Sequence, residues 1–124
     1  MSLDVMLYGP EAETECECQC GHKHTKKVRE CLYDANITHN LNTMAGEAGI
    51  YEQLWRPDEI GVTKASQLIE PLKVGLELLE SDKKRFEAFN PENGWGSYEG
   101  LVRYVREYLE ACREYPDANV EVSR

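Results

Sequence analysis

Apolar side chains recur at every second position at the start of the chain, at Leu3, Val5 and Leu7. Alternation with a period of two over this length is typical of a half-buried β-strand. The turn signal Gly9-Pro10 ends this predicted strand. Residues 119–122 predict a final strand, which could pair with the first strand and close the sheet.

Helical spacing replaces this alternation in the rest of the chain. Thr38 is a good N-cap for a first helix, and Ser97 for the last one. A helix is predicted from Thr63, and Pro71 inside its apolar pattern should kink it or open a new segment. Ser81 is predicted to cap a further short helix. Two cysteines outside the N-terminal cluster, Cys31 and Cys112, are expected in the core.

The early strand pattern and the later helical pattern together predict the fold class. We expect a single small α+β domain over residues 1–124, with a Cys/His-rich hairpin at about 12–28. Its antiparallel sheet would come from the N-terminal hairpin region plus the C-terminal strand, and several helices would cover it. No apolar run approaches membrane-spanning length, so no membrane contact is expected.

The composition is acidic, with a formal net charge of −9 at pH 7. General nucleic-acid binding needs a basic patch and is therefore not expected. Acidity spread along a chain usually serves solubility, and a protein that mimics nucleic-acid charge is the alternative. The odd number of cysteines, 5, and the lack of a leading signal peptide favour a reducing cytoplasm.

The densest chemistry lies in residues 16–24, which read Cys-Glu-Cys-Gln-Cys-Gly-His-Lys-His. Alternate side chains of a continuous strand are about 6.6 Å apart, so five of them would span about 26 Å. One tetrahedral ion cannot bridge that length. The chain must therefore turn if these residues share a metal, and Gly21 suits the turn.

One hairpin register gathers the cysteines and histidines. A three-residue loop of Gln19, Cys20 and Gly21 would set Cys18 opposite His22 and Cys16 opposite His24. The same register pairs Glu17 with Lys23, Glu15 with Thr25 and Glu13 with Lys27. Opposite charges placed directly across two strands are mildly favourable. A two-residue loop would instead place the cysteines across from Lys23 and Thr25 and scatter the ligand set.

Thiolate and imidazole ligands suit zinc, which needs four of them. The sequence predicts one zinc held by four of the cluster residues Cys16, Cys18, Cys20, His22 and His24, and Cys20 is the least suited of them. In the alternative interpretation the cysteines are half-buried small hydrophobes and the histidines are solvated. Disulfides are disfavoured, because cysteines two apart on one strand are poorly spaced for bridging.

A second candidate site combines polar and aromatic residues from three segments. Asparagines donate and accept hydrogen bonds, arginine recognises anions, and tryptophan offers a stacking face. We expect a pocket for a small planar or phosphorylated ligand, lined by Asn36, His39, Asn40, Arg56, Asn93 and Trp95. The alternative is that these residues cap helices and hold two loops together. His39 is the only histidine outside the cluster, and hence the only one there suited to acid–base chemistry.

Several stretches carry a resemblance to known sequences. They are Met-Ser-Leu-Asp-Val at the start, Asn-Ile-Thr-His-Asn-Leu from Asn36, Ile-Tyr-Glu-Gln-Leu-Trp-Arg-Pro from Ile50, and Asn-Pro-Glu-Asn-Gly-Trp-Gly-Ser-Tyr from Asn90. Together they resemble a family of small hypothetical proteins from bacteriophages and bacteria. The resemblance implies a phage or bacterial cytoplasmic setting, the host cytoplasm for a phage protein, and supplies no catalytic residues.

Three functions are compatible with these patterns. The first is a small cytoplasmic binding or accessory protein, for an unknown protein or small-molecule ligand, with a structural zinc on its hairpin. The second is a metal-dependent hydrolase with an open coordination position, in which His39, Glu52 or Asp58 would be the general base. The third is a phage inhibitor that sequesters a host nucleotide or blocks a host enzyme. The first reading, which is not an enzyme, is favoured.

Overall fold

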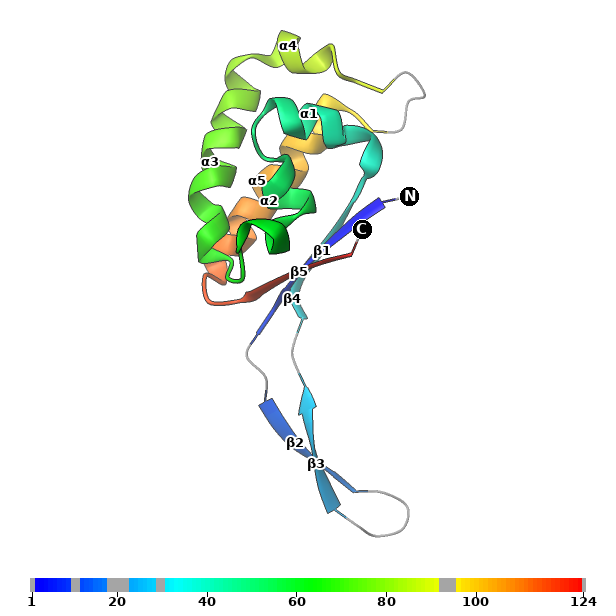
Figure 1. Cartoon of the computed structure of the whole chain (residues 1–124), viewed down its shortest axis with the longest axis vertical. Helices are drawn as coiled ribbons and strands as arrows, with labels where there is room; N and C mark the ends of the chain where they lie inside the picture. The colour runs from blue at the N-terminus through cyan, green and yellow to red at the C-terminus, as the bar shows by residue number, and fades with distance from the viewer. Residues whose placement is uncertain (1, 10–11, 18–22, 29–30, 92–95, 124) are drawn as a thin grey trace.

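A three-stranded antiparallel sheet carries the helices on one face, and a two-stranded arm extends from it (Figure 1). The computed structural model describes residues 2–9, 12–17, 23–28, 31–91 and 96–123, with 12–17 and 23–28 as backbone only. The sheet has the order β4-β1-β5, with bounds Cys31–Thr38, Ser2–Tyr8 and Asn119–Ser123. The arm is formed by β2 (Ala12–Glu17) and β3 (Lys23–Val28).

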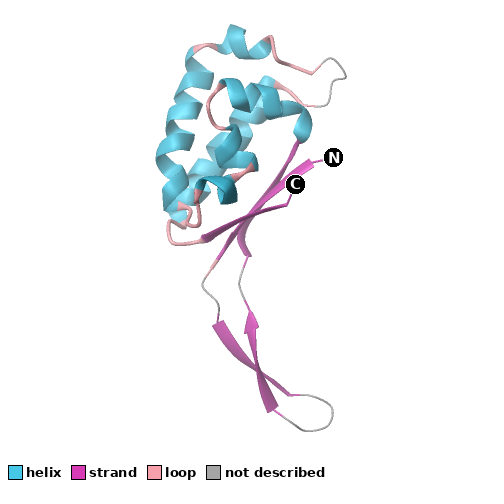
Figure 2. Ribbon diagram, viewed as in Figure 1, coloured by secondary structure: helices cyan, strands magenta, loops and turns pink. Residues whose placement is uncertain are grey.

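The helices follow β4 along the chain and lie together on one side of the sheet (Figure 2). A 3₁₀ turn η1 (His39–Leu41) leads into the short helices α1 (Asn42–Glu47) and α2 (Tyr51–Trp55). Another 3₁₀ turn, η2 (Pro57–Ile60), precedes the long helix α3 (Ser66–Ser81). Then come α4 (Lys83–Glu87) and the second long helix, α5 (Tyr98–Glu114).

The predicted α+β class and the closing role of the last strand are both confirmed. Leu3, Val5 and Leu7 are each 0% exposed, so their alternation does mark the covered face of β1. Val5 pairs with Ala35 of β4 on one side and with Val122 of β5 on the other. The first strand is therefore the central strand of the sheet, and the last strand lies beside it as an edge strand.

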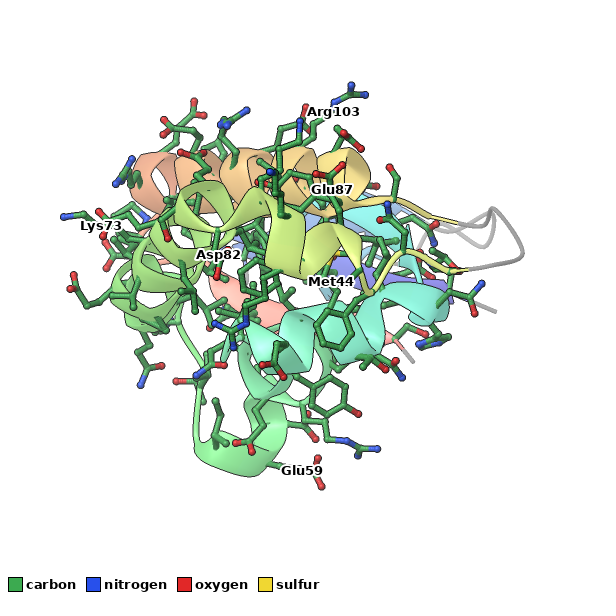
Figure 3. All side chains as sticks on the ribbon, turned by 90° about the horizontal axis from the view of Figure 1, so that it is seen from above. Met44, Glu59, Lys73, Asp82, Glu87 and Arg103 are labelled. Carbon is green, nitrogen blue, oxygen red and sulfur yellow. The ribbon has the colours of Figure 1, made fainter. Side chains whose placement is uncertain are left out.

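The long helices supply most of the remaining core. α5 buries one face against the sheet and α3, and α3 packs along it. Viewed from above, Lys73 of α3 and Arg103 of α5 reach away from the helices (Figure 3). Met44 of α1 is completely buried. The opposite face of the sheet carries no helix among the described residues (Figure 2).

Both predicted caps at the ends of the helical region form. Thr38 Oγ1 accepts a hydrogen bond from the Asn40 backbone N–H at 3.3 Å, at the start of η1. Ser97 Oγ accepts from the Gly100 N–H at 3.1 Å, at the start of α5. Side-chain caps of this kind satisfy the first N–H groups of a helix, which have no intrahelical partner.

Two other expectations need correction, those for Ser81 and Cys31, and one of the two alternatives for Pro71 is excluded. Pro71 does not open a new segment, because Leu68 and Leu72 on either side of it are buried in the same core and α3 continues through it. Ser81 is the last residue of α3 rather than a cap, since its hydroxyl donates back to the Leu78 carbonyl at 2.9 Å. Cys31 is exposed rather than buried, because the register of β1 and β4 shifts between Leu7 and Tyr8.

Candidate functional site

The arm has the backbone register that the sequence predicts. Cys16 pairs with His24, and the pairs on either side are Glu17 with Lys23 and Glu15 with Thr25. Glu13 pairs with Lys27 nearer the body. Directly opposed residues of an antiparallel pair occupy the same face of the ribbon. The register therefore places Cys16 and His24 at matched positions on one face.

The rest of the candidate metal centre lies outside the described residues. Cys18, Cys20 and His22 fall in residues 18–22, between the last paired positions of β2 and β3. Within the described parts of the chain, no group of three or more histidines, cysteines and acidic residues could hold a metal ion. The zinc centre thus remains a prediction, based on the register of the two strands that flank those residues.

The second candidate site is a network of side chains joined by two hydrogen bonds and one aromatic stack. The Trp55 indole N–H donates to Nδ1 of His39 at 2.7 Å. The Tyr51 ring stacks on Trp55, with ring centroids 5.6 Å apart. Nε of Arg56 donates to the Tyr51 hydroxyl at 3.2 Å. His39 and Arg56 therefore belong to one network. They do not contact each other directly in it, because Trp55 and Tyr51 lie between them.

Tyr51 and Trp55 were not among the predicted site residues. Their spacing of i and i+4 on α2 was the sequence feature that could have identified them, because such residues are neighbours on one helix face. Trp55 is only 2% exposed, so the aromatic pair also anchors α2 in the core. The network thus has a structural role whether or not it also meets a ligand.

The hydrogen bond from Trp55 determines the tautomer of the neutral His39 imidazole. Nδ1 must offer a lone pair to the indole N–H, so a neutral imidazole carries its proton on Nε2. That second nitrogen is then a hydrogen-bond donor. It can neither accept a proton from water nor coordinate a metal while the bond to Trp55 persists. His39 is therefore poorly placed as a general base.

Arg56 is held by the protein itself. Its Nη1 group donates to a Glu59 carboxylate oxygen at 2.9 Å, in addition to the bond from Nε to Tyr51. The Tyr51 hydrogen bond and the Glu59 carboxylate both raise the pKa of Arg56. The pair with Glu59 is exposed, so it adds little to stability. Its main effect is to orient the guanidinium.

The remaining predicted residues are dispersed. Asn36 lies on the uncovered face of the sheet, where its amide donates to Ser2 Oγ at 2.8 Å and to Asp4 Oδ1 at 2.6 Å. Asn40 is exposed within η1. Asn93 and Trp95 lie outside the described residues. Asn36 thus belongs to a different surface from the network of His39 and Arg56.

The residue after Trp95 is nevertheless close to the residue before His39. A Cβ atom added at Gly96 would lie 2.8 Å from Cγ2 of Thr38 and 3.0 Å from Cγ of Leu41. Gly96 also has a φ of +100°, a conformation that side chains disfavour. The chain entering α5 therefore packs directly on the turn that presents His39.

Sequence reasoning also missed a cluster of three tyrosines, formed by the partly buried Tyr33 of β4 and by the buried Tyr104 and Tyr108 of α5. Tyr33 stacks on Tyr108 with ring centroids 5.9 Å apart, and Tyr104 meets Tyr108 edge-on at 6.2 Å. The hydroxyls of all three are buried with no hydrogen-bond partner among the described residues. Burial raises the pKa of each phenol, well above the ordinary value for Tyr108. All three hydroxyls therefore stay protonated at neutral pH.

Removing the Tyr108 hydroxyl tests whether it lacks a partner. We expect Tyr108→Phe to stabilise the fold by about 1 kcal/mol, because an unpaired buried hydroxyl carries a desolvation cost. Tyr98→Phe is the matched control, since the Tyr98 hydroxyl donates to the Leu79 carbonyl at 2.6 Å. That variant should lose about 1 kcal/mol. Urea unfolding measures both, and a loss for Tyr108→Phe would show that its hydroxyl has a partner.

Comparisons with protein-family models, with curated proteins and with solved structures find no significant match to this chain. The described helices include none that is both long enough and apolar enough to span a bilayer. The interpretation of the arm and of the His39 network therefore rests on their own chemistry.

Proposed function

We propose that this chain is a small cytoplasmic binding or accessory protein whose arm carries a structural zinc. The observation that supports the zinc is the register that pairs Cys16 with His24. Continued by one more residue on each strand beyond the pair of Glu17 and Lys23, the same register would oppose Cys18 and His22. Four ligands of that kind complete a closed tetrahedral site, the arrangement typical of structural zinc.

The composition of the arm provides a second reason for a metal. The two strands read AETECE and KHTKKV, and both are mostly polar. They pair with each other in a sheet of their own, and the arm points away from the helices (Figure 1). An isolated two-stranded hairpin is at best marginally stable in water. A metal bound across the strands would supply the missing free energy of folding.

Metal content and hydrogen exchange test this proposal together. Protein purified without chelator should contain one zinc per chain by elemental analysis and native mass spectrometry. Adding a chelator should speed amide exchange in β2 and β3 and leave exchange in α3 and α5 unchanged, because the helices have their own apolar core. Absence of zinc, together with exchange in the arm that chelator does not change, would refute the proposal.

A pair of cysteine variants separates zinc binding from general effects of losing a thiol. Cys16→Ser should lower zinc affinity by at least tenfold, measured by competition with a chromogenic chelator. Cys31→Ser removes an exposed thiol of β4, outside the arm, and should leave zinc affinity unchanged. Equal losses in the two variants would contradict the assignment of Cys16 as a ligand.

The hydrolase alternative is less well supported. It needs a general base near an open metal position, and His39 is held by Trp55 with its available nitrogen protonated. The coordination number decides between the two functions. Four protein ligands indicate a structural zinc, whereas three ligands and a water indicate catalysis.

A further inference from the structure

The uncovered face of the sheet is a second surface for which the zinc proposal gives no role. The inward positions of β1 are covered by the core, and its outward positions alternate with them. Pairing then places outward positions of β4 and β5 beside those of β1. The outward set includes Ser2, Asp4, Met6, Tyr8, Cys31, Asp34, Asn36, Asn119, Glu121 and Ser123.

The charged residues at the outward positions of the three strands all carry the same sign. Each strand contributes one carboxylate, from Asp4 on β1, Asp34 on β4 and Glu121 on β5. No lysine or arginine occupies an outward position on the described strands of this sheet. Lys64 lies at the β5 edge, where its ammonium donates to Asn119 at 2.9 Å. A field of one sign over a whole sheet face attracts partners of the opposite sign.

The middle of the face combines this charge with an apolar strip. A hollow of about 330 Å³ is lined by Asp4, Met6, Asp34, Ala35, Asn36 and Ser123. Met6 and Tyr8 follow each other along the central strand, and the Tyr8 hydroxyl donates to Met6 Sδ at 3.5 Å. Lysine and arginine side chains lay their alkyl stems on apolar surface and keep the charged end beside acceptors. The hollow offers Met6 to the stem and Asp4 and Asp34 to the charged end.

We infer that the uncovered face of the β4-β1-β5 sheet docks a lysine- and arginine-rich segment of a partner protein. This deepens the proposed binding role by naming a partner class, and it requires no metal on the arm. A divalent cation fits less well. Asp4 already accepts a hydrogen bond from Asn36, and no metal-holding group occurs among the described residues. Nucleic acid would be repelled by carboxylates on all three strands.

Binding of a defined peptide tests the inference. The probe is a fluorescent ten-residue peptide of alternating lysine and alanine, measured by anisotropy at low and physiological salt. A peptide with glutamine in place of lysine should not bind. The double variant Asp4→Asn with Asp34→Asn should weaken binding of the lysine peptide by about fivefold to tenfold. Circular dichroism establishes that this variant remains folded.

A second double variant with the same change in net charge distinguishes loss of the docking site from a general loss of attraction between a basic peptide and an acidic protein. Glu70 and Glu77 are exposed on α3, away from the sheet face, and Glu70→Gln with Glu77→Gln should leave peptide affinity within about twofold. Equal weakening by the two pairs, or no binding at all, would overturn the inference. So would tight binding of Ca²⁺ that displaces the peptide. The peptide-binding measurement is repeated with chelator, and the affinity should not change because docking requires no metal on the arm. Failure of the zinc proposal would therefore leave peptide binding intact, whereas failure of the docking surface would abolish it.

Discussion

Raising the pH from 9 to 12 is expected to lower the free energy of unfolding progressively. The first group responsible is the thiol of Cys112. This thiol is 0% exposed on the inner side of α5, and burial raises its pKa from 9.0 to about 12. Burial likewise raises the pKa of Tyr33 from 10.0 to about 12. Both groups are neutral when protonated, so the folded state holds these protons more tightly than the unfolded chain does.

The sign of the effect follows from that difference. Below pH 9 both groups are protonated in both states, and their contribution to stability is fully present. Between pH 9 and 12 the unfolded chain loses the Cys112 proton while the folded chain keeps it, which costs about 1.4 kcal/mol for each pH unit. Tyr33, Tyr104 and Tyr108, whose pKa values burial raises, add to the loss only above pH 10.

Urea unfolding with chelator present, at pH values from 8 to 11.5, measures this loss. Between pH 9 and 10 the decline should disappear in Cys112→Ala, whose fold is less stable overall but has no thiol to ionise. Cys31→Ala is the control, because that thiol is exposed. The assignment to Cys112 fails if its alanine variant shows the same decline over that unit of pH.

Repeating patterns made the sheet and the arm predictable. The alternation of Leu3, Val5 and Leu7 identified the covered face of β1 because a strand in an antiparallel sheet has only two faces. The register of the arm followed from one glycine and from the charges of Glu17 and Lys23, since loop length and cross-strand pairs fix register. These are local rules, and they held without knowledge of the rest of the fold.

The second site was less predictable because it depends on contacts between separate elements. His39 follows β4 and Trp55 ends α2, and no periodic pattern specifies a hydrogen bond between them. Asn36 was grouped with His39 because they are close in sequence. Alternation along β4 instead turns Asn36 to the outward face, since its neighbour Ile37 is only 7% exposed. The apolar residue Ile37 was thus the sequence feature that could have placed Asn36 on the outward face of the sheet, away from His39.

Whether the core can accept an added methyl group also depends on contacts between separate elements, and not on helix propensity alone. Gly75 lies in the middle of α3, where glycine is intrinsically unfavourable compared with alanine. Propensity alone would therefore predict that Gly75→Ala stabilises the helix. The packing predicts the opposite. A Cβ atom at this position would lie 2.3 Å from Cγ2 of Ile50, which is only 1% exposed and has little room to move.

Gly75→Ala is accordingly expected to destabilise the fold by about 1–3 kcal/mol, the usual cost of overpacking a core. Gly46 of α1 is the matched control, because a Cβ atom there would meet only Tyr51 Cβ, at an ordinary 3.8 Å. Gly46→Ala should stabilise by about 0.5–1 kcal/mol. Opposite signs for the same substitution in two helices would separate packing from propensity, and urea unfolding at pH 7 measures both.

A double variant tests directly whether Ile50 is the residue that the Gly75→Ala methyl group meets. Ile50→Ala alone should cost about 2–5 kcal/mol, because it empties space in the core. In the double variant the Gly75→Ala methyl occupies part of that space. The two changes together should therefore cost less than the sum of their separate effects, by about 1 kcal/mol or more. Strict additivity would mean that Gly75 and Ile50 do not limit each other, and the cost of Gly75→Ala would then have to arise elsewhere along α3.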